Sequence, residues 1–159
     1  MFGCLACDVS PYLTDIFSSH ETLLKPKACF TSSKFRDLSS AIANVHESQG
    51  FFITAWVFLP DPWHAIVYPH PLTISNVLRT IKLRSTSAIN ERRSESGPVW
   101  QERFFDRILR TVKEYWETVD YIHMNPVRRG LMMRSEDWRW SSIHSLRRRP
   151  AMPLCQSMW

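Results

Sequence analysis

The stretch FFITAWVFLPDPWHAIVY, residues 51–68, decides the fold of this chain because it contains two apolar runs separated by a turn. Residues 51–59 are almost wholly apolar and rich in β-branched and aromatic side chains, which predicts a strand buried on both faces. A Pro-Asp-Pro turn interrupts the run, and residues 63–68 resume it. Two such runs joined by a short turn predict an antiparallel hairpin.

Helical periodicity flanks this hairpin on both sides. Between Ser33 and Gly50, apolar residues recur at i, i+3, i+7 and i+10, which predicts a helix that the glycine ends. A second helix is expected to begin at Thr73 or Ser75 and to carry one apolar stripe as far as Ile81.

The next part of the chain contains a loop, a strand and a helix. Residues 84–98 are polar, rich in Ser and Arg and end in Gly-Pro, which predicts a loop. Residues 104–109 are a candidate for a short strand. Thr111 and Glu114 have the spacing of a capping box, and the helix that they begin is expected to stop at Asn125-Pro126.

The order of these elements predicts an α+β fold. Residues 12–17 add a possible first strand, although Asp15 weakens it. Strand, helix, hairpin, helix, strand and helix describe a ferredoxin-like sandwich, with an antiparallel sheet and helices packed on one face. We expect three segments: a poorly patterned N-terminal segment 1–33, a folded domain 34–145 and a basic tail 146–159.

Composition fits one domain with an anionic partner. The chain has 159 residues, of which 44% are hydrophobic, enough to bury a core, so we do not expect global disorder. Its 20 Lys and Arg against 15 Asp and Glu give a net charge of +5, and the arginines concentrate after residue 79. This distribution favours a nucleic acid, whose phosphates suit the planar guanidinium, over a merely solvated face with a basic tail.

Cysteine use and hydropathy indicate the compartment. Cys4 and Cys7 have the spacing of a zinc pair, but no second pair follows at a suitable distance, so we interpret the spacing as coincidence. No apolar run approaches 18 residues, and the N-terminus lacks the segments of a signal peptide. We therefore expect a cytoplasmic protein with reduced thiols and no membrane partner.

Three residues suggest chemistry, and each has a structural alternative. Tyr121 and Asn125 lie four positions apart on one helix, so they project from one face and suit a nucleophile and a metal ligand. The alternative is a half-buried tyrosine beside a C-capping asparagine. His64 follows a turn on an apolar strand, where a histidine is either a metal ligand or a core residue.

Three segments carry a resemblance to a known family. They are WQERFFDRIL at 100–109, YIHMNPVRRGL at 121–131 and EDWRWSS at 136–142. Together they resemble the REP-associated tyrosine transposases, relatives of the single-tyrosine HUH transposases, in the same order and spacing. The resemblance extends from about residue 51 to 145 and implies that 34–145 is a transposase-like catalytic and DNA-binding domain.

The resemblance implies roles for individual residues. Tyr121 would attack a phosphate of single-stranded hairpin DNA, leaving a 5′-phosphotyrosine and a free 3′-hydroxyl. His64 and Asn125 would hold Mg²⁺ or Mn²⁺, as the second histidine of a pair and the helix ligand. The first histidine is replaced by Pro62, which has no donor atom, and Asp61 is expected to point away from His64. Metal binding is therefore expected to be weak or absent.

DNA contacts are expected from arginines around the nucleophile, namely Arg103, Arg107, Arg110, Arg128 and Arg129. Four tryptophans are candidates for stacking on unpaired bases or for ordinary packing: Trp100, Trp116, Trp138 and Trp140. Three hypotheses follow. The chain is an impaired DNA nickase and strand transferase, an inactive module that binds DNA hairpins, or a transposon remnant.

Overall fold

The computed structural model describes residues 14–18, 32–60, 63–100 and 104–146. Along the chain its elements are β1 (Thr14–Ser18), α1 (Ser32–Gln49), β2 (Phe52–Val57), β3 (Trp63–Tyr68), α2 (Ile74–Arg93), β4 (Phe105–Ile108), α3 (Val112–Arg128), the 3₁₀ turn η1 (Ser135–Asp137) and α4 (Ile143–Leu146). The expected hairpin is confirmed as β2 and β3, which pair antiparallel. None of the helices in these ranges is long and apolar enough to cross a membrane.

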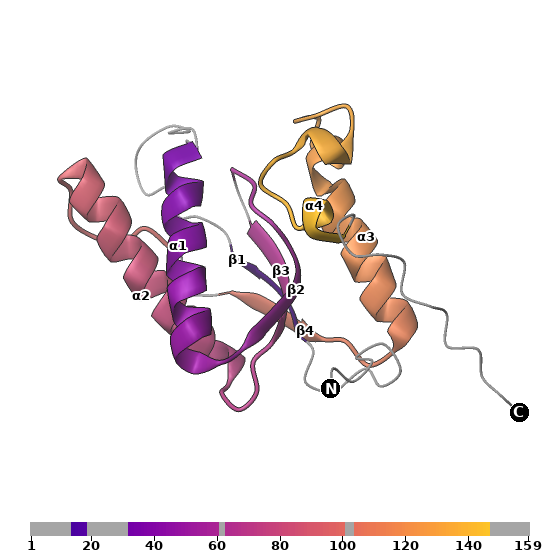
Figure 1. Cartoon of the computed structure of the whole chain (residues 1–159), viewed down its shortest axis with the longest axis horizontal. Coiled ribbons are helices and arrows are strands. Elements are labelled where there is room, and N and C mark those ends of the chain that lie inside the picture. The colour runs from indigo at the N-terminus through magenta and orange to yellow at the C-terminus, as the bar shows by residue number, and fades with distance from the viewer. Residues whose placement is uncertain (1–13, 19–31, 61–62, 101–103, 147–159) are drawn as a thin grey trace, which may run out of the picture.

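The four strands form one antiparallel sheet in the order β2-β3-β1-β4. With one helix between β1 and β2 and another between β3 and β4, this is the ferredoxin-like arrangement predicted from the sequence (Figure 1). β1 lies in the interior of the sheet, where Ile16 stands opposite both Ala65 of β3 and Asp106 of β4. The sheet therefore begins well before residue 34, where the sequence placed the start of the folded domain.

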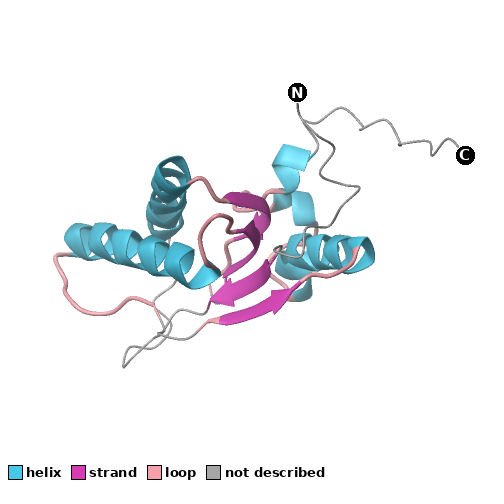
Figure 2. Cartoon of the chain, turned by 90° about the horizontal axis from the view of Figure 1, so that it is seen from below, coloured by secondary structure: helices cyan, strands magenta, loops and turns pink. Residues whose placement is uncertain are grey.

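Helices cover both faces of the sheet, which corrects the prediction of a single covered face. Alternate residues of β3 point to opposite sides: Trp63 and Val67 pack with α1 and α2, while Ile66 packs with Val119 and Ile122 of α3. Figure 1 shows α1 and α2 on one side and α3 on the other, and Figure 2 shows the strands between two groups of helices. The sequence predicted apolar stripes but did not specify which face each stripe would cover.

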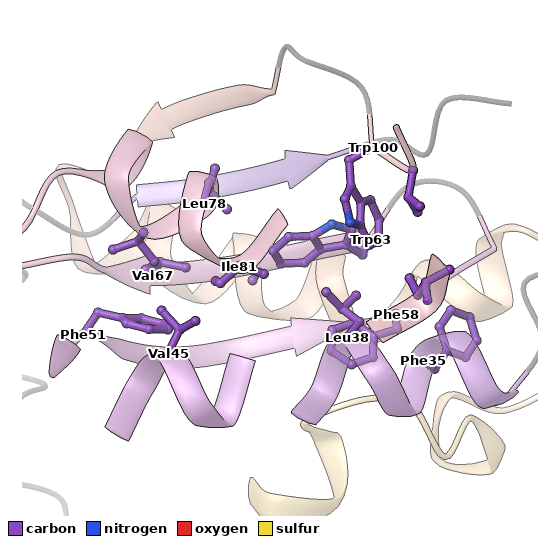
Figure 3. Close-up of a cluster of buried hydrophobic side chains, with 14 residues drawn as sticks. Phe35, Leu38, Val45, Phe51, Phe58, Trp63, Val67, Leu78, Ile81 and Trp100 are labelled. Carbon is purple, nitrogen blue, oxygen red and sulfur yellow. The ribbon is translucent and has the colours of Figure 1, made fainter. Parts of the chain in front are cut away.

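The larger of the two cores lies under α1 and α2. Aromatic and aliphatic side chains from both helices and both hairpin strands meet there, with Trp63 near its centre (Figure 3). Phe35 and Leu38 of α1 and Leu78 and Ile81 of α2 belong to it. These are the residues whose helical spacing predicted the two helices, so the predicted stripes are confirmed as core.

α2 continues to Arg93, so the prediction of a loop from residue 84 is wrong for its first ten positions. Ser85 and Ile89 extend the buried stripe of Ile81 at intervals of four residues, and all three are buried. The Ser85 hydroxyl accepts a 2.8 Å hydrogen bond from Trp100 Nε1. In this part of α2 only one residue per turn is buried, and one of the two is a serine. A pattern this sparse is hard to recognise in a polar sequence.

α3 also runs further than predicted, passing through Pro126 to Arg128. Thr111 and Glu114 form the expected capping box at its start. Pro126 removes one backbone donor, but it lies in the last turn, where the helix is closed by bonds from Arg129 N to Asn125 O and from Leu131 N to Pro126 O. Gly130 has a φ of 65° and ends the helix.

The segment after α3 returns to the edge of the sheet. Phe58 N donates to Trp140 O, and Ser142 N donates to Trp56 O, both at 2.9 Å. Val57 and Ser141 form an isolated antiparallel bridge. The C-terminal segment thus covers the outer edge of β2 and holds it close to α3.

Candidate functional site

Tyr121 projects from the middle of α3 toward the sheet and remains 43% exposed. Its ring meets the imidazole of His64 edge to face, with the ring centroids 5.7 Å apart. The contact exists because His64 and Ile66 lie on the face of β3 that α3 covers. The fold therefore brings together two of the three residues singled out from the sequence.

His64 is uncharged at neutral pH. Its side chain is buried, with 5% of the residue exposed. Burial, the larger cause, and the positive charge of Arg129 together lower its pKa from 6.5 to about 4. A neutral imidazole can accept a hydrogen bond or bind a metal ion through an unprotonated nitrogen.

Asn125 lies one helical turn beyond Tyr121 and is 3% exposed. Its Oδ1 accepts a 3.1 Å hydrogen bond from Arg129 Nε. Its Nδ2 is buried and has no hydrogen-bond partner among the residues that the structure describes. Its backbone oxygen accepts from Arg129 N, which is the regular bond of the last helical turn, and the C-cap of α3 is Arg129 and not the asparagine.

Two consecutive arginines at the end of α3 contact different members of the site. The guanidinium of Arg128 lies over the ring of Tyr121, 5.2 Å from its centroid. Arg129 bonds Asn125 and acts electrostatically on His64. Positive charge therefore lies both beside Tyr121 and beside His64 and Asn125, which we call the buried polar pair.

The other predicted arginines lie toward the opposite end of α3. Arg107 on β4 donates from Nη2 to the hydroxyl of Thr118 at 3.0 Å. Arg110 is exposed immediately before the helix. α3 spans about 25 Å at 1.5 Å per residue, so Arg110 is far from Arg128 and Arg129, whereas Arg107 contacts the helix nearer its middle, at Thr118. Arg103 lies outside the described residues.

Three of the four candidate tryptophans have packing roles. Trp100 is buried and bonds Ser85, and the indole of Trp138 donates to Phe58 O at 2.8 Å. Trp140 packs against the larger core. Trp116 on α3 is 47% exposed and keeps a ring surface open for stacking.

His123 and Ser142 form a buried contact that supports the site. His123 Nε2 and Ser142 Oγ are 2.9 Å apart, and the same hydroxyl lies 2.9 Å from Trp56 N and 3.2 Å from Trp56 O. This hydroxyl therefore ties α3 to β2. The sequence did not single out Ser142, although it lies in the resembling segment 136–142, which was the available signal.

The described residues do not fit a divalent ion. None of them forms a group of three or more His, Cys, Asp or Glu that could hold a metal. His64 and Asn125 supply two donors, and the oxygen of Asn125 already accepts a bond from Arg129, whose charge opposes a cation. Asp61 and Pro62 lie outside the described residues, so their expected roles stay predictions.

Comparisons with known proteins agree on one family. The family model described as "Transposase IS200 like" matches residues 25–125. The REP-associated tyrosine transposase of Escherichia coli (strain K12) is 34% identical over 115 residues, which cover 71% of this chain and 67% of that protein.

A solved structure of a REP-associated tyrosine transposase bound to a REP hairpin matches with a TM-score of 0.73 and 29% identity. The match covers 87% of this chain and 81% of that one. A solved protein from Deinococcus radiodurans, with a TM-score of 0.51 and 12% identity, shares the fold alone. This chain belongs to the IS200-like transposase family, among the REP-associated tyrosine transposases.

Proposed function

We propose that this chain binds hairpin DNA that carries single-stranded segments, and that Tyr121 is retained as a nucleophile while metal-assisted cleavage is impaired. One observation carries the proposal. The half-exposed Tyr121 stands between His64 and Arg128, one turn from the Asn125–Arg129 pair. The similarity to a hairpin-bound relative supports DNA hairpins as the substrate class.

In the proposed reaction the oxygen of Tyr121 attacks a backbone phosphorus. A new bond forms between this oxygen and phosphorus, and the bond from phosphorus to the 3′-oxygen breaks. The phenol loses its proton and the departing oxygen gains one, which leaves a 5′-phosphotyrosine and a 3′-hydroxyl. Attack by a 3′-hydroxyl on the phosphotyrosine reverses these changes and rejoins the strand.

The arginines are proposed to position and neutralise the phosphates. Arg128 and Arg129 lie beside the nucleophile and suit the phosphate that is attacked. Arg107 and Arg110, together with Arg103, are proposed to bind phosphates further along the DNA. Trp116 is proposed as the stacking partner for an unpaired base.

The proposal includes no metal-bound step. In a complete site of this family the ion would polarise the phosphate, but the two described donors do not fit it. We propose that any affinity for Mg²⁺ or Mn²⁺ is weak and that cleavage is correspondingly slow. The hairpin-binding function does not depend on this step.

The test is covalent capture of a labelled hairpin oligonucleotide by the wild type, Tyr121→Phe and Pro62→His, each with Mn²⁺. We expect all three to bind the hairpin, the wild type to form little adduct, and Pro62→His to form more. Adduct in Tyr121→Phe would contradict the proposed nucleophile. Hairpin binding without adduct in Pro62→His would leave a pure binding module, and no binding in any variant would refute the proposal.

A further inference from the structure

We propose that the guanidinium of Arg129 takes the place of a metal ion beside His64 and Asn125, and that it binds a DNA phosphate directly. This inference rests on the proposed function, in which a phosphate lies next to Tyr121. It gives the site a source of positive charge although its described donors do not fit a divalent ion. Its consequence is DNA binding that needs no metal.

The contacts of Arg129 place its charge at the buried polar pair. Its Nε donates to Asn125 Oδ1 at 3.1 Å, the atom through which an asparagine would bind a metal ion. It is also the charged residue that acts on His64. Both of these partners are buried whereas Arg129 is exposed, so the guanidinium lies between them and the solvent-facing side of the site.

A divalent ion and this guanidinium are competing occupants. Bringing a cation to Asn125 Oδ1 would place two like charges within a few ångströms in a partly buried setting, where screening by water is reduced. The ion would also have to displace or share the hydrogen bond from Nε. The arrangement therefore disfavours a metal ion at Asn125 Oδ1.

A guanidinium performs part of what an ion does for a phosphate. It supplies positive charge and N–H donors of the kind that match two phosphate oxygens, and its Nε donates to Asn125. It does not accept an electron pair from an oxygen as a metal does. We therefore expect DNA binding to be preserved more fully than the acceleration of cleavage. Arg128, whose guanidinium lies over the ring of Tyr121, adds positive charge to the site.

The first test measures binding of a fluorescein-labelled hairpin oligonucleotide with single-stranded flanks, in EDTA and in Mn²⁺. The variants are Arg129→Gln, Arg129→Lys and, as a matched control, Arg84→Gln on α2, which packs on the opposite face of the sheet. We expect the wild type to have equal affinity for the hairpin in both buffers. Arg129→Gln should lower this affinity by about tenfold or more, and Arg129→Lys should recover part of it. Arg84→Gln should lower it by less than about threefold. Wild-type affinity that rises with Mn²⁺ and is insensitive to Arg129→Gln would overturn the inference and leave the proposed function intact.

The second test needs no DNA and decides the inference even if the hairpin does not bind. The imidazole signals of His64, assigned with His64→Gln, are followed by NMR during addition of phenyl phosphate and then of Mn²⁺. We expect phenyl phosphate to shift them in the wild type and not in Arg129→Gln, and Mn²⁺ to leave them sharp. Paramagnetic broadening of His64 by Mn²⁺ in the wild type, or an equal shift in Arg129→Gln, would overturn the inference.

Discussion

At the scale of single residues, the site combines an accessible nucleophile with two buried polar side chains. Tyr121 is exposed enough to reach a ligand, while His64 and Asn125 have little contact with water. Burial and the positive charge of Arg129 keep the imidazole uncharged, and Arg129 also supplies positive charge to the site. The charge available to a phosphate thus comes from arginines and not from histidine.

The buried histidine makes the stability of the protein depend on pH. The pKa of His64 is about 4 in the folded chain against 6.5 for an ordinary, solvated histidine, so the unfolded chain binds more protons between these values. The free energy of unfolding is therefore highest above pH 6.5 and falls as the pH drops toward 4. The difference between these two pKa values corresponds to a decrease of about 3 kcal/mol in the free energy of unfolding.

Urea unfolding at pH 7.5 and pH 4.5 checks this prediction in the wild type and in His64→Gln. The variant should lose most of the pH dependence and keep a smaller part from His123, whose pKa burial also lowers. An unchanged pH dependence in His64→Gln would show that another group causes it.

The hydroxyl of Ser142 gives a second prediction at this scale. Ser142→Ala should lower the free energy of unfolding by about 2 kcal/mol, because His123 Nε2 and Trp56 N would both lose a buried partner. Ser145→Ala, at an exposed position nearby, is the control and should change stability by less than about 0.5 kcal/mol. Chemical denaturation measures both, and equal effects would contradict the bridging role.

At the scale of elements, the sequence located the helices and strands better than it located their ends. The two helices that run beyond their predicted ends do so for different reasons. α2 continues because Ser85 and Ile89 pack inward, and α3 continues because the bonds at Arg129 and Leu131 close its last turn despite Pro126. Propensity and spacing describe a segment alone, whereas the packing that extends α2 comes from outside it; the bonds that close α3 are local.

The second half of α2 can be tested by a cavity. Ile89→Ala should lower the free energy of unfolding by about 2–4 kcal/mol, because Ile89 is fully buried. Leu83→Ala on the same helix is the control, since Leu83 is 62% exposed, and it should cost less than about 1 kcal/mol. If both substitutions have the same small effect, residues 84–93 behave as the loop that the sequence predicted.

The start of α3 offers a prediction about capping. Thr111→Ala should cost about 1 kcal/mol, because the threonine hydroxyl accepts from Glu114 N at 3.1 Å. Glu114→Gln should cost more than Glu117→Gln, whose carboxylate contacts Lys113 at 3.8 Å and no cap. Thermal unfolding compares the variants, and equal midpoints for Glu114→Gln and Glu117→Gln would exclude a stabilising capping box.

At the scale of the whole molecule, the sheet depends on a strand from the N-terminal segment. β1 pairs with both β3 and β4, so its removal would leave two strands without their common neighbour. We expect the full chain to unfold in one cooperative transition and a chain lacking residues 1–31 to lose it. A similar transition in the shortened chain would instead support an independent domain starting near residue 34.

The distribution of charge along α3 predicts how DNA binding responds to salt. Arginines lie near both ends of this helix, so several phosphates should be neutralised together and affinity for a hairpin should fall steeply with ionic strength. Arg110→Gln should reduce the slope of log Kd against log salt by about 0.7 if it contacts one phosphate of a single strand. An unchanged slope would remove Arg110 from the proposed interface.

The sequence by itself determined the β2–β3 hairpin, the α+β class, the capped α3 and the shared helical face of Tyr121 and Asn125. These features follow from backbone periodicities that each segment carries alone. The tertiary structure decided the rest: which helix covers which face, how far α2 runs, and which side chains from different segments meet. His64 reaches Tyr121 because α3 packs on one face of β3, and Arg129 reaches Asn125 because α3 continues past Pro126. Contacts between segments depend on how the sheet and helices pack, which no single stretch of sequence specifies.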